Sequence, residues 1–126
     1  MKFNTAQKEF FGASAGAGSP VTAREYFDSQ ITLDIPEREI VERVIPRSDI
    51  PRGSVKKAGT EPFTFRLWNS PETADLNLNI PKPLRSETRL YISKERGFKP
   101  EPNHFWFVFT NKKDKELVLG SMTKEE

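Results

Sequence analysis

Apolar and polar side chains alternate in short segments along most of the chain, which is the pattern of β-strands with one buried face. Alternation is weak in residues 2–11 and clearer in residues 30–35, 63–68, 76–80 and 90–92. Two further strands are predicted over residues 105–109 and 116–120. In residues 105–109 (FWFVF) both sets of side chains are apolar, so we expect that strand to be buried on both faces. Residues 111–115 are polar and predict a hairpin turn after it.

One helix is predicted directly after residues 30–35. Pro36 suits the first position of a helix, where its missing N–H leaves no hydrogen bond unmade. Glu37 and Glu39 fall in the first turn, where the helix dipole favours acidic side chains. Pro46 ends the segment. Apolar side chains recur between these points at helical spacing: Ile40, Val41, Val44 and Ile45.

Two segments are predicted to be loops. Residues 11–20 (FGASAGAGSP) consist mostly of glycine, alanine and serine, so we expect a flexible loop that packs no core. Residues 46–62 contain several prolines and glycines and predict a second, longer loop.

The chain has room for one domain over residues 1–126, with residues 122–126 as a tail or linker. Ten Phe, two Trp and two Tyr supply much of its core. About seven short strands and one or two short helices predict a mainly β fold, closed as a barrel or open pseudobarrel. A sandwich of two sheets would give the same alternation.

Composition narrows the class of protein. The absence of cysteine excludes disulfides and thiolate sites. Charged Lys2, Lys8 and Glu9 stand where a signal peptide needs an apolar core, and no apolar run is long enough to span a bilayer. We therefore expect a soluble, intracellular protein.

Positive charge is concentrated in two segments, although the net charge is only +2. Residues 46–60 contain Arg47, Arg52, Lys56 and Lys57 against Asp49. Residues 81–99 hold six basic side chains against two acidic ones: Lys82, Arg85, Arg89, Lys94, Arg96 and Lys99 against Glu87 and Glu95. Such clustering is typical of surfaces that bind polyanions, and equally of ordinary solvated loops.

The patterns of common catalytic centres are missing from the sequence. His104 is the only histidine, so no two-histidine metal site can form. No Asp or Glu is followed two residues later by Lys, the spacing of many Mg²⁺-dependent nucleases. No glycine-rich loop ends in Gly-Lys-Ser/Thr. We expect no catalytic residue, metal or cofactor in this chain.

Arg85, Glu87 and Arg89 carry the strongest functional signal. In an extended segment, residues at i, i+2 and i+4 project from one face. Arginine can bind guanine O6 and N7 together, and glutamate can accept from the cytosine amino group. The three residues are therefore equipped to read G·C pairs in a major groove. An ion-pair ladder on a solvated face is the alternative interpretation.

Neighbouring segments offer further DNA contacts. The segment FRLWNS (residues 65–70) supplies phosphate donors and, in Asn69, a residue able to read adenine. Lys82 precedes Arg85, and Lys94 and Arg96 follow Arg89, so they suit phosphate contacts. The complete set of predicted contacts from these segments is Arg66, Trp68, Asn69, Ser70, Lys82, Arg85, Glu87, Arg89, Lys94 and Arg96.

Two longer segments carry a family resemblance. SQITLDIPEREIVERVIP (residues 29–46), followed by RSETRLYIS (residues 85–93), resembles the N-terminal DNA-binding domain of EcoRII-type restriction endonucleases. FRLWNS is similar to part of the second recognition arm of plant B3 domains. The resemblance implies a B3-like, seven-stranded open pseudobarrel whose two arms grip the major groove. Its second arm corresponds to residues 66–99, with Arg85, Glu87 and Arg89 on the bases.

The resemblance also implies a first arm within residues 10–30 and a particular role for the chain. Contacts from that side are expected at Lys8, Arg24, Ser29 and Gln30. Domains of this family read a short site of the CC-(A/T)-GG kind for a nuclease domain in the same polypeptide. By this likeness the chain is the target-recognition module of a prokaryotic type II restriction endonuclease, cytoplasmic and nucleoid-associated, with double-stranded DNA as its partner.

Three other functions remain open from the residues alone. Basic loops could engage an acidic protein partner. Exposed Trp68, Tyr91 or Trp106 could stack on single-stranded nucleic acid, which requires that these rings not be buried. We expect Trp106 in the core. A hydrolase using paired carboxylates is the third alternative.

Overall fold

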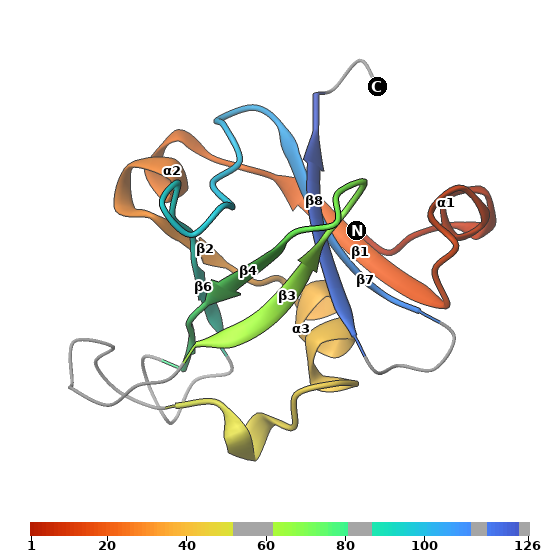
Figure 1. Ribbon diagram of the computed structural model, residues 1–126, viewed down its shortest axis with the longest axis horizontal. Helices are drawn as coiled ribbons and strands as arrows, with labels where there is room; N and C mark the ends of the chain where they lie inside the picture. Colours follow the sequence, from red (N-terminus) through yellow and green to blue (C-terminus); the bar gives the residue numbers. More distant parts are fainter. Residues whose placement is uncertain (52–61, 81–86, 112–115, 124–126) are drawn as a thin grey trace.

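The computed structural model describes residues 1–51, 62–80, 87–111 and 116–123, and these form a mainly β protein. Eight strands lie in two sheets, accompanied by three α-helices (Figure 1). The predicted fold class is therefore confirmed in its coarse form. The prediction of seven strands is not, because the described residues alone contain eight.

The larger sheet has five strands. Their order is β1 (Ala15–Pro20), β7 (Phe105–Thr110), β8 (Leu117–Met122), β3 (Phe63–Leu67) and β4 (Thr73–Leu76). All neighbours are antiparallel except β3 and β8, which run parallel. Neither end of this order pairs with the other within the described strands, so the sheet is open.

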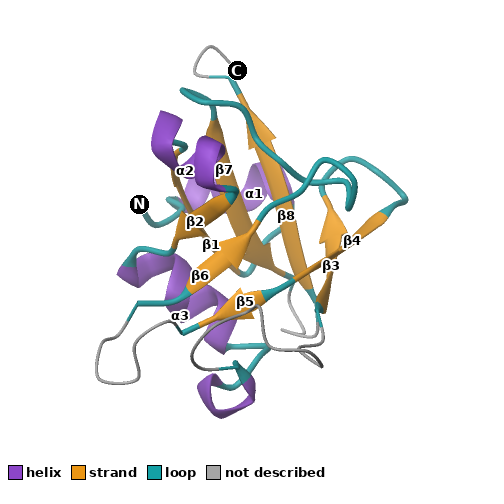
Figure 2. Cartoon of the chain, turned by 90° about the vertical axis from the view of Figure 1, so that its left-hand side faces the viewer, coloured by secondary structure: helices purple, strands orange, loops and turns teal. Residues whose placement is uncertain are grey.

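The smaller sheet has three strands and carries two of the predicted DNA contacts, Gln30 and Arg89. Its order is β2 (Gln30–Thr32), β6 (Arg89–Tyr91) and β5 (Leu78–Asn79), and Figure 2 faces it. Leu90 lies opposite both Ile31 and Leu78 in the register. These three side chains are buried, so the residues before and after Leu90 on β6 point away from the core.

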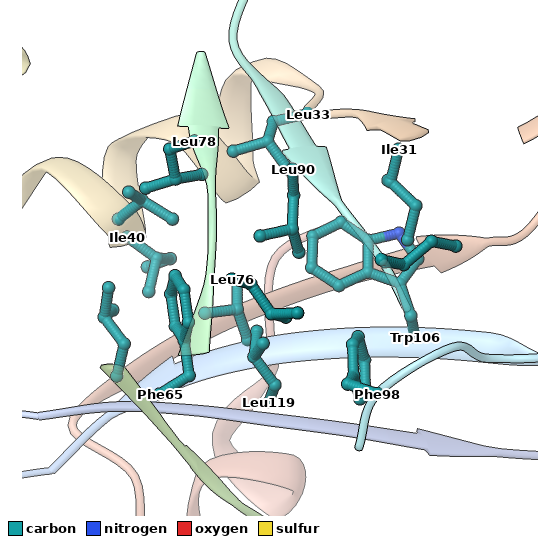
Figure 3. Close-up of a cluster of buried hydrophobic side chains, with 14 of the residues drawn as sticks. Ile31, Leu33, Ile40, Phe65, Leu76, Leu78, Leu90, Phe98, Trp106 and Leu119 are labelled. Carbon is teal, nitrogen blue, oxygen red and sulfur yellow. The ribbon is translucent and has the colours of Figure 1, made fainter. Parts of the chain in front are cut away.

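The main core lies between the two sheets and is closed by α3 (Ile35–Glu42). Figure 3 shows Ile31, Leu78 and Leu90 of the smaller sheet opposite side chains of the larger sheet. Trp106 of β7 is only 1% exposed, as expected, so it cannot serve as a stacking platform for bases. Each buried large side chain stabilises the fold by roughly 1.5–3 kcal/mol relative to its exposed state.

A second apolar cluster lies on the outer face of the larger sheet. Phe107 and Phe109 form it with Val118, and α1 (Thr5–Phe11) adds Phe11. Because Trp106 and Val108 point to the main core, β7 is buried on both faces, as its sequence predicted.

The prediction of a strand in residues 2–11 is wrong, because Thr5–Phe11 is α1. Asn4 and Gln7 form a capping box, each side chain accepting a backbone N–H of the other residue at 2.8 Å. Gly12 ends the helix in the left-handed conformation with φ 66°. The capping interactions at both ends therefore favour a helix in this segment, and the weak alternation does not predict its structure.

The prediction of a flexible loop over residues 11–20 is also wrong, because Ala15–Pro20 is β1, and its first four residues are buried. Small side chains are required there. A Cβ atom on Gly18 would lie 2.6 Å from the carbonyl oxygen of Trp106, and one on Gly16 would lie 2.9 Å from Cβ of Phe109. The edge strand β1 thus fits against the aromatic strand β7 because its residues have small side chains or, at the glycines, none.

Two other predicted elements are shorter than expected. The strand predicted over residues 30–35 ends at Thr32, since α3 begins at Ile35 with Pro36 in its first turn. The strand predicted over residues 76–80 is interrupted at Asn77, which separates β4 from β5. Within the described residues, no helix has the length and apolar character needed to cross a membrane.

Candidate nucleic-acid interface

Arg89 lies at the centre of the candidate interface, on the outward face of β6. Its Nη1 donates a hydrogen bond to Oε1 of Gln30 on β2 at 3.1 Å. Its Nη2 lies 3.5 Å from Oε2 of Glu87, forming an ion pair. About a third of the side chain is exposed, 34% for Arg89 and 37% for Glu87. The guanidinium is thus held by two neighbours, while its Nε is buried without a hydrogen-bond partner.

Two of the three residues in the predicted row, Glu87 and Arg89, are among the described residues. Arg85 and Lys82 lie outside the described residues. Glu87 and Arg89 do share a face and pair with each other, which the alternative interpretation of an ion-pair ladder also expected. The bond to Gln30, however, joins Arg89 to a segment 59 residues away in the chain.

A polar hollow beside Arg89 brings together residues from both predicted arms. Its volume is about 280 Å³. Arg24 and Gln30 of the first arm line it with Arg89 of the second. The remaining lining residues were not predicted: Thr22, Glu25, Asp28 and Thr32. The signal that could have identified them is the pattern Thr-x-x-Glu at residues 22–25, which marks a helix start.

Helix α2 (Ala23–Asp28) positions the first-arm residues. Oε1 of Glu25 accepts from the backbone N–H of Thr22 at 3.0 Å, and its Oε2 accepts from the N–H of Thr32 on β2 at 3.1 Å. Glu25 therefore fastens α2 to the strand that carries Gln30. Arg24 is 92% exposed and lies 3.6 Å from the carboxylate of Asp28 one turn later, a weak surface pair.

Ser29 ends α2 in the left-handed conformation, with φ 57°. Its carbonyl oxygen accepts a hydrogen bond of 3.0 Å from the N–H of Ile92, which follows β6. The backbone of Ser29 thus holds the two arms together.

A tight turn over residues 93–98 follows β6 and presents Lys94 and Arg96. Ser93 and Phe98 exchange backbone hydrogen bonds of 2.8 and 3.0 Å, and Gly97 adopts the φ of 99° that the turn requires. Nη1 of Arg96 donates to Oδ1 of Asn77 at 2.8 Å. The Arg96 guanidinium therefore ties the turn to the β4–β5 junction.

Lys94 contacts α2 across the turn. Its ammonium lies 5.8 Å from the ring centroid of Tyr26. The hydrogen bond with the Tyr26 hydroxyl raises the pKa of Lys94, and the charge of Glu101 contributes to the rise.

The predicted contacts of FRLWNS lie in a different hollow, which shares no lining residue with the one beside Arg89. Trp68 packs edge-on against Phe11, with ring centroids 5.4 Å apart, in the outer apolar cluster. Asn69 has a φ of 57° in the β3–β4 turn, and the Ser70 hydroxyl accepts from the N–H of Glu72. These residues therefore have structural partners of their own.

The last two predicted contacts lie in this second region. Arg66 pairs with Glu116 at 3.5 Å across exposed surface. Lys8 lies in the last turn of α1, the helix that covers the outer cluster. Among the predicted DNA contacts that the structure describes, one group lies on or beside the smaller sheet and another lies around Trp68.

No metal-binding cluster of three or more His, Asp or Glu side chains occurs among the described residues. His104 is half-buried, and its backbone bonds to Val21 and Glu101.

The chain matches no protein-family model, no curated protein and no solved structure. The candidate function therefore depends on the residues and their geometry.

Proposed function

We propose that this chain binds double-stranded DNA sequence-specifically through the major groove, with Arg89, Glu87 and Gln30 at the reading surface. The observation that supports this proposal is the pair of contacts made by Arg89. It forms an ion pair with Glu87, two residues earlier, and a hydrogen bond with Gln30 of β2, which is far away in the sequence. A guanidinium held on two sides loses less conformational freedom when it binds a base edge. Nη1 and Nη2 each carry a second hydrogen for that purpose.

The chemistry of the three side chains favours G·C pairs. Arg89 supplies the paired donors that match guanine O6 and N7, and Glu87 is an acceptor for the cytosine amino group. Gln30 has both an acceptor, engaged by Arg89, and an amide donor. Arg85 extends this set in the sequence, two residues before Glu87.

We further propose that the domain is the target-recognition module of a type II restriction endonuclease, reading a short site of the CC-(A/T)-GG kind. The resemblance of residues 29–46 and 85–93 supports this assignment. In this proposal the chain binds without cutting, and a nuclease domain of the same polypeptide cleaves. The two DNA-gripping arms correspond to α2 with β2, and to β6 with the turn after it.

Selection of bound duplexes from a random pool, read by sequencing, tests the proposal. Wild-type protein should enrich a short motif with flanking G·C pairs. Glu87→Ala should relax the preference at one or more positions, at a cost of roughly 1–3 kcal/mol of discrimination per lost base contact. Arg43→Ala is the matched control. Arg43 lies at the C-terminal end of α3, a helix that packs against β1 and β7 of the larger sheet and is not part of the proposed reading surface.

Two results would sink the proposal. One is the absence of any enriched motif with the wild-type protein. The other is an Arg89→Ala variant that selects the same motif with the same affinity as the Arg43→Ala control.

A further inference from the structure

Two lysine side chains converge on one aromatic ring at the edge of the candidate interface. The ammonium of Lys99 lies 4.4 Å from the ring centroid of Tyr26, and that of Lys94 lies 5.8 Å from the same centroid. Both distances are within the range of cation–π attraction. In Figure 1 the teal segment that follows β6 runs beside α2, which carries Tyr26.

The ring is a fixed platform. Tyr26 is half-buried and packs against the main core. The backbone of α2 is fastened to β2 through Glu25, as described above. The ring therefore holds two flexible side chains in one place, which lowers the entropy that each would lose on binding an anion.

The segment carrying the lysines is also fixed. Lys94 is the second residue of the tight turn over residues 93–98, and Lys99 directly follows the turn. Phe98 between them is buried, and Arg96 ties the turn to Asn77. The turn therefore presents two lysines from a rigid base while Arg96 serves the fold.

The protein only partly offsets the positive charge of this pair, because the charge of Glu101 acts on Lys94. Neither lysine forms an ion pair with any part of the chain that the structure describes. An anion bound beside the ring would be attracted by both positive charges. The arrangement therefore favours binding of an oxyanion with several acceptor atoms.

We infer that Lys94, Lys99 and Tyr26 form a binding site for one backbone phosphate of DNA, beside the bases that Arg89 and Glu87 read. This inference rests on the proposed function, since α2 and β6 contribute to both places. The lysines fix the register of the protein on the duplex and carry no base preference. The sequence marked Lys99 only as part of the basic segment 81–99, and its placement with Lys94 at the Tyr26 ring depends on the fold.

The test is the salt dependence of binding to the selected duplex and to an unrelated duplex. Each phosphate contact contributes about 0.9 to the slope of log affinity against log salt. Lys94→Gln and Lys99→Gln should each weaken binding to both duplexes equally, by about five- to tenfold at moderate salt, and lower the slope by up to about one. Lys2→Gln is the charge-matched control, because Lys2 pairs with Glu39 of α3.

The outcomes separate this inference from the proposed function. If wild-type protein selects a motif but both lysine variants behave like Lys2→Gln, the phosphate site is wrong and the DNA reader stands. If either lysine variant changes the selected motif, the residue contacts a base and the inference also fails. If the wild-type protein binds no duplex, the proposed function itself falls. Thermal melting of each variant checks that it is folded.

Discussion

The hydroxyl of Ser19 on β1 donates a hydrogen bond of 2.8 Å to the carboxylate of Glu37 on α3. Glu37 is fully buried, and its Oε1, which accepts from Ser19, also accepts from the backbone N–H of Asp34 at 3.2 Å. A buried charge needs such donors, because its desolvation costs several kcal/mol. The contact therefore joins the edge of the larger sheet to the helix that closes the core.

Replacement of Ser19 by Ala should lower the free energy of unfolding by about 1–3 kcal/mol, because a buried carboxylate loses a donor. Urea unfolding measures the change. Glu39→Gln is the control, since Glu39 forms an exposed pair with Lys2 and should shift stability by less than about 1 kcal/mol. Equal small effects of the two substitutions would contradict a stabilising role of the Ser19 bond.

Gly18→Ala should destabilise the protein by about 1–3 kcal/mol, because its Cβ would overlap the carbonyl of Trp106 and force β1 away from β7. Thermal and urea unfolding report the loss. Gly12→Asn is the contrasting variant: no atom lies within 4 Å of a Cβ there, and Asn tolerates the left-handed conformation. Wild-type stability of Gly18→Ala would mean that β1 does not pack as closely as described.

Gln30→Ala should reduce affinity for the selected duplex about tenfold, which equals about 1.4 kcal/mol, while binding to unrelated DNA changes little. The reason is that Arg89 loses one of its two supports. Fluorescence anisotropy with both duplexes measures the difference. Thr32→Ala, on the same strand and lining the same hollow, should leave both affinities unchanged. A similar loss in both variants would argue against support of Arg89 by Gln30.

Arg96→Ala should lower the free energy of unfolding by about 1 kcal/mol, because the turn over residues 93–98 loses its bond to Asn77. DNA affinity should fall modestly, with an unchanged salt slope. This separates Arg96 from Lys94, whose replacement lowers the slope. A slope reduced by about one in Arg96→Ala would instead assign its guanidinium to a phosphate.

Local sequence pattern was sufficient to predict β3, β7 and β8, because β3 alternates, β7 is a run of apolar side chains and β8 follows a polar turn. It failed for β1, whose glycines and alanines match the space left by Phe107 and Phe109 on a strand 90 residues later. No local pattern contains that information. The start of α1, by contrast, was readable from the Asn4 and Gln7 capping pair.

The candidate interface was predictable in its residue types more than in its assembly. Arg89 and Glu87 were identified from their spacing, and Gln30 as part of a separate arm. Their contact depends on the pairing of β2 with β6. The grouping of Trp68 with α1, away from Arg89, likewise depends on which face of the larger sheet each side chain occupies.

The pairing of β2 with β6 also affects the order in which the protein can fold during synthesis. Gln30 leaves the ribosome well before Arg89, and the separation in sequence between β1 and its partner β7 is longer still. Until those partners emerge, β2 lacks a neighbouring strand and β1 pairs only with residues 1–3. The long separation in sequence slows the search for the missing strands. Neither half of the chain can display the Arg89 surface by itself, so a nascent or truncated chain should be unable to bind DNA through it.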